Sequence, residues 1–137
     1  MIRKLLPCIV LLASAVTSDA CTSMIVSAQA SATGRPLLWK HRDTSAENNF
    51  VASVPSTATT AAYVALYNVG DSLLSEAWMG LNEYGFAIMN TASYNLAPDT
   101  TAYKDREGVV MSKALSSCRS VDDFERLLTE LPKPLGV

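Results

Sequence analysis

The alternation of apolar and polar residues near the start of the chain predicts a hairpin. Residues 22–28 alternate small and β-branched side chains, a pattern typical of a strand. Residues 32–35 supply a turn in which Gly34 is free to take a positive φ, and a return strand begins at residues 36–39. Closure of this hairpin would bring residues 40–43 back beside Cys21.

Further apolar stretches predict three more strands, joined by short connections. The expected strands are residues 61–69, 72–79 and 86–92, with a turn at 68–71 around Gly70 and a tight connection at 80–85. Strands joined by short turns pair antiparallel, and apolar residues on both faces predict a sheet covered on both sides. The polar, Ser/Thr/Asn-rich stretch 44–60 predicts a long surface loop.

The last third of the chain predicts two helices after a loop at residues 94–105. The first spans residues 106–117 and ends at Cys118, which we expect to be a small buried residue. Ser120 begins a capping-box pattern, and apolar residues follow at helical spacing as far as Leu131. Strands followed by helices indicate an α+β fold.

Residues 1–20 predict a secretory signal peptide. Arg3 and Lys4 precede an apolar run at residues 5–16, and Ser18 and Ala20 are the small residues of a cleavage site. The run is too short to span a bilayer. We therefore expect an exported, periplasmic or extracellular protein whose mature part, residues 21–137, begins at Cys21 and has no membrane segment.

Composition narrows the range of partners. The chain has 137 residues, of which 49% are hydrophobic and 18% charged, as in an ordinary globular domain. Loss of the signal peptide leaves 9 of 11 basic and 12 of 13 acidic side chains, so no basic surface remains for nucleic acid. The sequence has no metal-ligand spacing and no cofactor motif, so we expect neither a metal nor a cofactor.

Two cysteines remain after the signal peptide, Cys21 and Cys118, and three interpretations of Cys21 are open. The pair could form a disulfide, as in many exported proteins. Cys21 could be lipid-anchored, although Ser18 and Asp19 do not suit that signal. As the first residue of the mature chain, Cys21 could instead be a nucleophile, its α-amine taking up the thiol proton.

Two ordered motifs resemble the N-terminal-nucleophile hydrolases of the choloylglycine hydrolase and penicillin acyltransferase type. The first comprises Cys21-Thr22-Ser23, Val26-Ser27, Gly34 and Asp43, and the second is the G-x-N-E-x-G pattern of residues 80–85 before a strand. The resemblance spans residues 21–137. It implies a four-layer αββα sandwich, of which this chain supplies the N-terminal part. It also implies cleavage of a small non-peptide or peptide amide through a thioester, by hydrolysis or acyl transfer.

The same resemblance implies roles for individual residues. Cys21 would be the nucleophile, and Asp43 would hold its α-amine. Lys40 stands where the family usually has arginine, and lysine lacks the bidentate fork. Asn90 is an approximate match to the family's oxyanion donor.

Strand geometry raises a difficulty for the first motif. Residues three apart on a strand face opposite ways, so Lys40 and Asp43 share a face only if the strand ends or bulges at His41–Arg42. On a regular strand Arg42 would face away from Asp43. His41 is as consistent with an outward-facing strand residue as with a catalytic base.

The chain ends at Gly136–Val137 without another strand to pack under the helices, and the family's remaining catalytic residues have no counterpart. We expect a truncated domain that is inactive alone and prone to homo-oligomerise. Two rival hypotheses stay open: a secreted or anchored binding domain in which Cys21 is structural, and a natural short product without activity.

Overall fold

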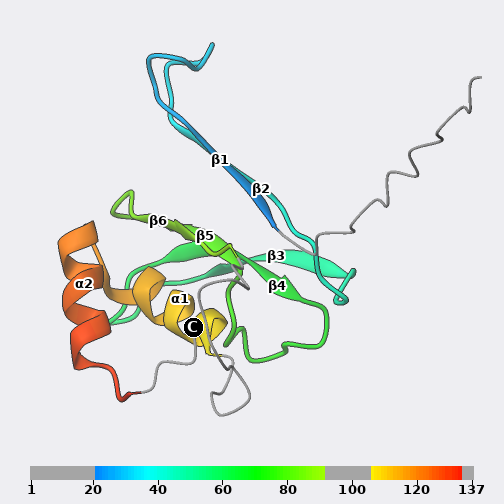
Figure 1. Cartoon of the computed structure of the whole chain (residues 1–137). Helices are drawn as coiled ribbons and strands as arrows, with labels where there is room; N and C mark the ends of the chain where they lie inside the picture. Colours follow the sequence, from blue (N-terminus) through cyan, green and yellow to red (C-terminus); the bar gives the residue numbers. More distant parts are fainter. Residues whose placement is uncertain (1–20, 92–105, 134–137) are drawn as a thin grey trace, which may run out of the picture.

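The computed structural model describes residues 21–91 and 106–133 and has an α+β fold (Figure 1). The predicted signal peptide and the loop at 94–105 lie outside the described residues. The described part contains two antiparallel sheets and two helices. Its elements are β1 (Thr22–Val26), β2 (Leu37–His41), β3 (Asn49–Val54), β4 (Tyr63–Asn68), β5 (Met79–Asn82), β6 (Ala87–Met89), α1 (Glu107–Ser117) and α2 (Val121–Glu130).

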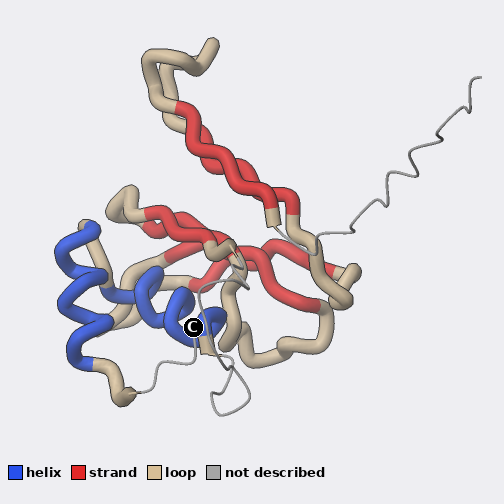
Figure 2. The backbone as a smooth tube through the Cα atoms, in the orientation of Figure 1, coloured by secondary structure: helices blue, strands red, loops and turns tan. Residues whose placement is uncertain are grey.

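β1 and β2 form the predicted hairpin, a two-stranded sheet separate from the other strands. Thr22 pairs with His41 and Val26 with Leu37, and Gly34 in the turn adopts a φ of 66° as expected. The hairpin projects from the body of the molecule, as the tube in Figure 2 shows. Its apolar side chains are largely exposed on both faces, namely Met24, Ile25, Leu37 and Trp39.

The other four strands form one antiparallel sheet in the order β3–β4–β5–β6. The prediction of a long loop at 44–60 is wrong, because β3 lies within it and pairs along its whole length with β4. Alternate residues of β3, beginning with Phe50, share the sheet face of the buried Tyr67, while Val51 and Ser53 are exposed. A polar composition is compatible with a strand here because β3 is at the edge of the sheet and only one of its faces is packed.

The predicted strand at 72–79 is also wrong, because the carboxylate of Asp71 organises much of this segment as a loop. It accepts hydrogen bonds from the backbone N–H groups of Ser75 at 3.1 Å and Glu76 at 2.9 Å. Leu74 within the loop has a φ of 52°. A side-chain oxygen that satisfies several backbone donors competes with strand pairing.

Gly80 lies inside β5 and not in a tight connection, so the predicted turn at 80–85 begins too early. A Cβ on Gly80 would lie 2.5 Å from the Leu115 side chain and 2.8 Å from the carbonyl oxygen of Val64. Glycine is therefore required here because α1 approaches the sheet closely. The turn itself is closed by a hydrogen bond from the Gly85 N–H to the Asn82 carbonyl.

Both helices lie on one face of the four-stranded sheet (Figure 1). Met111 and Leu115 of α1 pack against the buried side chains of β4, including Tyr63 and Tyr67. A second cluster joins Phe86, Ala114 and Cys118 to α2. On the opposite face Val51, Val64 and Leu81 are exposed, so the sheet is covered on one side only within the described residues.

The helix boundaries predicted from the sequence are confirmed to within a residue or two. Ser120 and Asp123 form the expected capping box at the start of α2. At the end of α1, the side chain of Asn82 donates to the carbonyl oxygens of Leu115 and Cys118. None of the described helices is long and apolar enough to cross a membrane.

Candidate functional site

Cys21 lies at the base of the hairpin, where the two strands meet the rest of the molecule. Its sulfur is 4.0 Å from the carbonyl oxygen of Asp43, which confirms that hairpin closure returns residues 40–43 to Cys21. Cys21 and Cys118 are both free thiols, which argues against the disulfide hypothesis. Cys118 is buried, and burial raises the pKa of its thiol, whereas Cys21 is partly exposed.

Lys40 links the hairpin to the four-stranded sheet. It pairs with Ser23 across the hairpin, and its ammonium group donates to the carbonyl oxygen of Trp78 at 3.2 Å and to Oδ1 of Asn90. Burial lowers the pKa of Lys40, while the nearby charge of Cys21 acts in the opposite direction. Lys40 lies across the hairpin from Ser23, two residues after Cys21.

Asn90 follows β6 directly and holds the Lys40 side chain. Lysine has only donors, so the amide oxygen of Asn90 must face Lys40 and its NH2 group must point elsewhere. That NH2 group lies 3.4 Å from a carboxylate oxygen of Glu107, at the start of α1. The role of Asn90 as an oxyanion donor stays a prediction; in the structure its amide orients Lys40.

Arg42 lies just beyond the end of β2 and turns back toward the four-stranded sheet. Its guanidinium carbon is 4.4 Å from the centre of the Trp78 ring, and its NH1 group donates to the amide oxygens of Asn49 and Asn68. Burial lowers the pKa of Arg42, and the Cys21 charge opposes this shift. Arg42 directly precedes Asp43, whose carbonyl oxygen contacts the thiol. The end of β2 at His41 confirms the expected strand break.

Asp43 and His41 contribute less to this cluster. The carbonyl of Asp43 contacts Cys21, but its exposed carboxylate has no hydrogen bond or ion pair with another described residue. Its role in holding an α-amine stays a prediction. His41 pairs with Thr22 and lies on the hairpin face opposite Lys40, as expected for an outward-facing residue.

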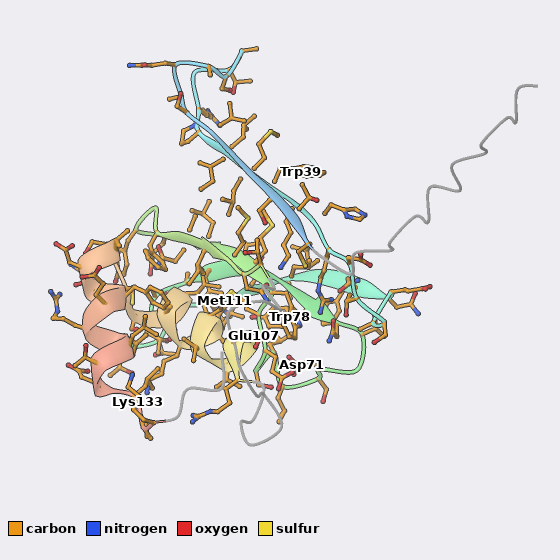
Figure 3. The ribbon with its side chains drawn as sticks, viewed as in Figure 1. Trp39, Asp71, Trp78, Glu107, Met111 and Lys133 are labelled. Atoms are coloured by element: carbon orange, nitrogen blue, oxygen red, sulfur yellow. The ribbon has the colours of Figure 1, made fainter. Side chains whose placement is uncertain are left out.

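Four residues of the site carried no signal that sequence reasoning used: Asn49, Asn68, Trp78 and Glu107. They lie on β3, on β4, before β5 and at the start of α1, so only tertiary packing brings them to the base of the hairpin. Figure 3 shows Trp39 projecting from the hairpin, away from the helices. An acidic residue in the first turn of a helix is the one hint that the sequence holds for Glu107.

Donors outnumber acceptors at this cluster. Among the described residues, the buried Ser23 hydroxyl and the indole N–H of Trp78 have no hydrogen-bond partner. Lys40 and Arg42 add several N–H groups, and their acceptors are neutral carbonyl and amide oxygens. A surplus of donors around a thiol suits a ligand that carries oxygen atoms.

The two main hollows of the described residues lie away from the thiol. Two shallow hollows of about 500 and 300 Å³ lie along α2, around Arg126 and Glu130, and neither includes Cys21. No group of three His, Cys, Asp or Glu side chains in the described ranges could hold a metal ion.

No family model matches the chain, and no curated protein or solved structure matches it significantly.

Proposed function

We propose that this chain is the N-terminal part of an exported cysteine amidohydrolase or acyltransferase of the N-terminal-nucleophile type. One observation carries the proposal: hairpin closure brings the Cys21 thiol to the carbonyl of Asp43, at the end of the strand that carries Lys40. The two sequence motifs beginning at Cys21 and Gly80 support the family. Cysteine acts as a nucleophile in its thiolate form.

The reaction would proceed through a thioester on Cys21. The thiolate attacks the carbonyl carbon of the amide, forming a C–S bond and an oxyanion. The ammonium group of Lys40, which donates to the amide oxygen of Asn90, would stabilise that oxyanion. Collapse of the intermediate breaks the C–N bond, and the amine leaves with the proton that the α-amine of Cys21 had taken from the thiol. Water or a second amine then cleaves the thioester and regenerates the thiol.

We further propose that cleavage before Cys21 completes the site. The freed α-amine of Cys21 would take the thiol proton. Asp43 would be the partner of this amine, because the carbonyl of Asp43 already contacts the Cys21 sulfur. In the four-layer sandwich of this family, the hairpin would belong to a second sheet. Exposed apolar side chains on both faces of the hairpin, such as Ile25 and Trp39, support this placement.

The decisive experiment uses protein secreted from the complete reading frame with its leader intact. Intact mass and N-terminal sequencing should place the first residue at Cys21, without a lipid. Incubation with an amide panel should then give product and an acyl adduct at Cys21. Cys21→Ala should abolish both, Cys21→Ser should leave weak turnover, and the matched control Cys118→Ala should retain the activity.

Two outcomes would contradict the proposal. A mature start elsewhere, or a lipid on Cys21, would remove the amine that the mechanism needs. Full amide turnover by a folded Cys21→Ala variant would show that Cys21 is not the nucleophile, whereas a correctly processed protein that acts on no amide would favour the binding-domain interpretation.

A further inference from the structure

Glu107 has no task in the chemistry described above, yet its side chain lies at the end of a hydrogen-bonded series. Its Oε1 atom is 3.4 Å from the side-chain NH2 group of Asn90, whose Oδ1 accepts from the ammonium group of Lys40. Glu107 begins α1, Asn90 follows β6, and Lys40 lies on β2. Three side chains from three separate elements therefore link the first helix to the hairpin.

The order of donors and acceptors in this series fixes how the amide of Asn90 lies. An ammonium group can only donate and an ionised carboxylate can only accept, so the amide oxygen faces Lys40 and the NH2 group faces Glu107. Lys40 alone would select the oxygen. The carboxylate restrains the opposite end, so the amide is held on both sides by charge-assisted hydrogen bonds.

The charges that act on Lys40 give this carboxylate a second role. Both acceptors of the ammonium group are neutral oxygens. Burial lowers the pKa of Lys40 most, and the positive charge of Arg42 also lowers it. The charges of Cys21 and Glu107 raise the pKa of Lys40. Glu107 is the carboxylate among these groups, so its negative charge favours the protonated lysine.

We propose that Glu107 is a positioning residue for Lys40: its carboxylate holds the Asn90 amide, which orients the ammonium group, and its negative charge keeps that group protonated. The effect on catalysis rests on the proposed function, in which Lys40 stabilises the oxyanion, because a neutral amine is a weaker donor to a negative oxygen. The arrangement itself belongs to the resting protein, so it can be measured without any amide.

Titration of Lys40 tests the inference directly. Protein secreted from the complete reading frame is labelled at lysine Cε for NMR detection, and the Lys40 signal is identified by its loss in Lys40→Met. In Glu107→Gln we expect the titration midpoint of Lys40 to fall by about one pH unit, because the carboxamide keeps an acceptor oxygen but loses the charge. Glu125→Gln is the matched control, since it neutralises an exposed carboxylate on α2 and should leave the midpoint unchanged.

Two further measurements guard against misfolding of the Glu107→Gln variant. Glu107→Asp keeps the charge on a shorter side chain and should give an intermediate midpoint for Lys40. In the unsubstituted protein, the side-chain NH2 signals of Asn90 should shift as carboxylates protonate, between about pH 6 and pH 3. Asn90 signals that do not respond to acid, or an unchanged Lys40 midpoint in folded Glu107→Gln, would overturn the inference.

Amide cleavage separates this inference from the proposed function. Glu107→Gln should move the basic limb of the kcat/KM profile to lower pH by about the same amount as the Lys40 midpoint, which a purely structural role would not do. If the Lys40 midpoint falls but no amide is cleaved, the positioning role stands and the proposed function fails. If amides are cleaved and the midpoint does not move, the proposed function stands and the positioning role fails.

Discussion

Lys40 donates a hydrogen bond to the amide oxygen of Asn90, a residue 50 positions further along the chain. The contact joins β2 of the hairpin to the end of β6 in the other sheet, and Asn90 in turn reaches Glu107 on α1. One side-chain pair thus connects the hairpin, the four-stranded sheet and the first helix at the site of the nucleophile.

This pair should behave as one unit in catalysis. Lys40→Met and Asn90→Leu should each lower kcat/KM for amide cleavage by roughly 10- to 100-fold, since either change removes the oriented ammonium group. The double variant should be no worse than the more damaging single one. A double-mutant cycle should give a coupling of about 1–3 kcal/mol. Additive losses would show that the two residues act separately.

Asn82 of the G-x-N-E-x-G motif should be essential for stability. Its side chain is buried, donates to the carbonyls of Leu115 and Cys118, and accepts from the backbone N–H groups of Tyr84 and Phe86. Asn82→Ala should lower the free energy of unfolding by about 2–4 kcal/mol, and Asn82→Asp should be at least as damaging because it removes the NH2 donor. Urea denaturation measures both.

The neighbouring Glu83 provides the control for Asn82. Its carboxylate accepts one exposed hydrogen bond from the Ala62 N–H, so Glu83→Ala should lower the free energy of unfolding by under about 1 kcal/mol. Equal effects of Glu83→Ala and Asn82→Ala would contradict a structural role for the buried amide.

Gly80→Ala should destabilise the protein, although alanine is otherwise acceptable in a strand. The added Cβ would meet both the side chain of Leu115 and the backbone oxygen of Val64. We expect a loss of about 1–3 kcal/mol in the free energy of unfolding. Truncating Leu115 to alanine should not rescue Gly80→Ala, because the clash with the backbone remains. A rescued double variant would show that Leu115 alone sets the requirement for glycine.

The loop around Asp71 should make stability depend on pH. Burial raises the pKa of Asp71, but hydrogen bonds from the backbone of Glu76 and Ser75 outweigh it and give a lowered pKa. A carboxyl whose folded pKa is lowered stabilises the fold above its unfolded pKa, and this contribution is lost as pH falls through the folded pKa.

Asp71→Asn should therefore lower the urea midpoint at pH 7, and the difference from the unsubstituted protein should shrink below about pH 4. Glu125→Gln, which neutralises an exposed carboxylate on α2, is the control for removal of negative charge. A difference that stays constant between pH 7 and pH 3 would refute the assignment to Asp71.

Local patterns predicted the parts of the fold that local contacts determine. The capping box at Ser120 and the positive φ of Gly34 follow from residues a few positions apart. The missed strand β3 and the misplaced start of β5 depend instead on distant partners. Gly80 resembles a turn residue in the sequence because the helix that requires it lies 35 positions further along the chain.

The same distinction between local and distant contacts applies to the candidate site. Hairpin closure was enough to predict that the end of β2 returns to Cys21, whose sulfur contacts the carbonyl oxygen of Asp43. Sequence spacing could not indicate that Arg42 stacks on Trp78, because that contact forms between two separate sheets after β2 ends. On a regular strand Arg42 would have faced away from Asp43, so its position depends on the strand break at His41.

The division of the site between two sheets has a thermodynamic consequence. Cys21, Lys40 and Arg42 come with the hairpin, while Trp78, Asn68 and Asn90 come with the other sheet. The equilibrium that docks the hairpin is therefore also the equilibrium that assembles the site. A molecule that binds groups from both sheets therefore stabilises the docked hairpin. By the same linkage, any change that stabilises the docked hairpin raises the affinity for that molecule.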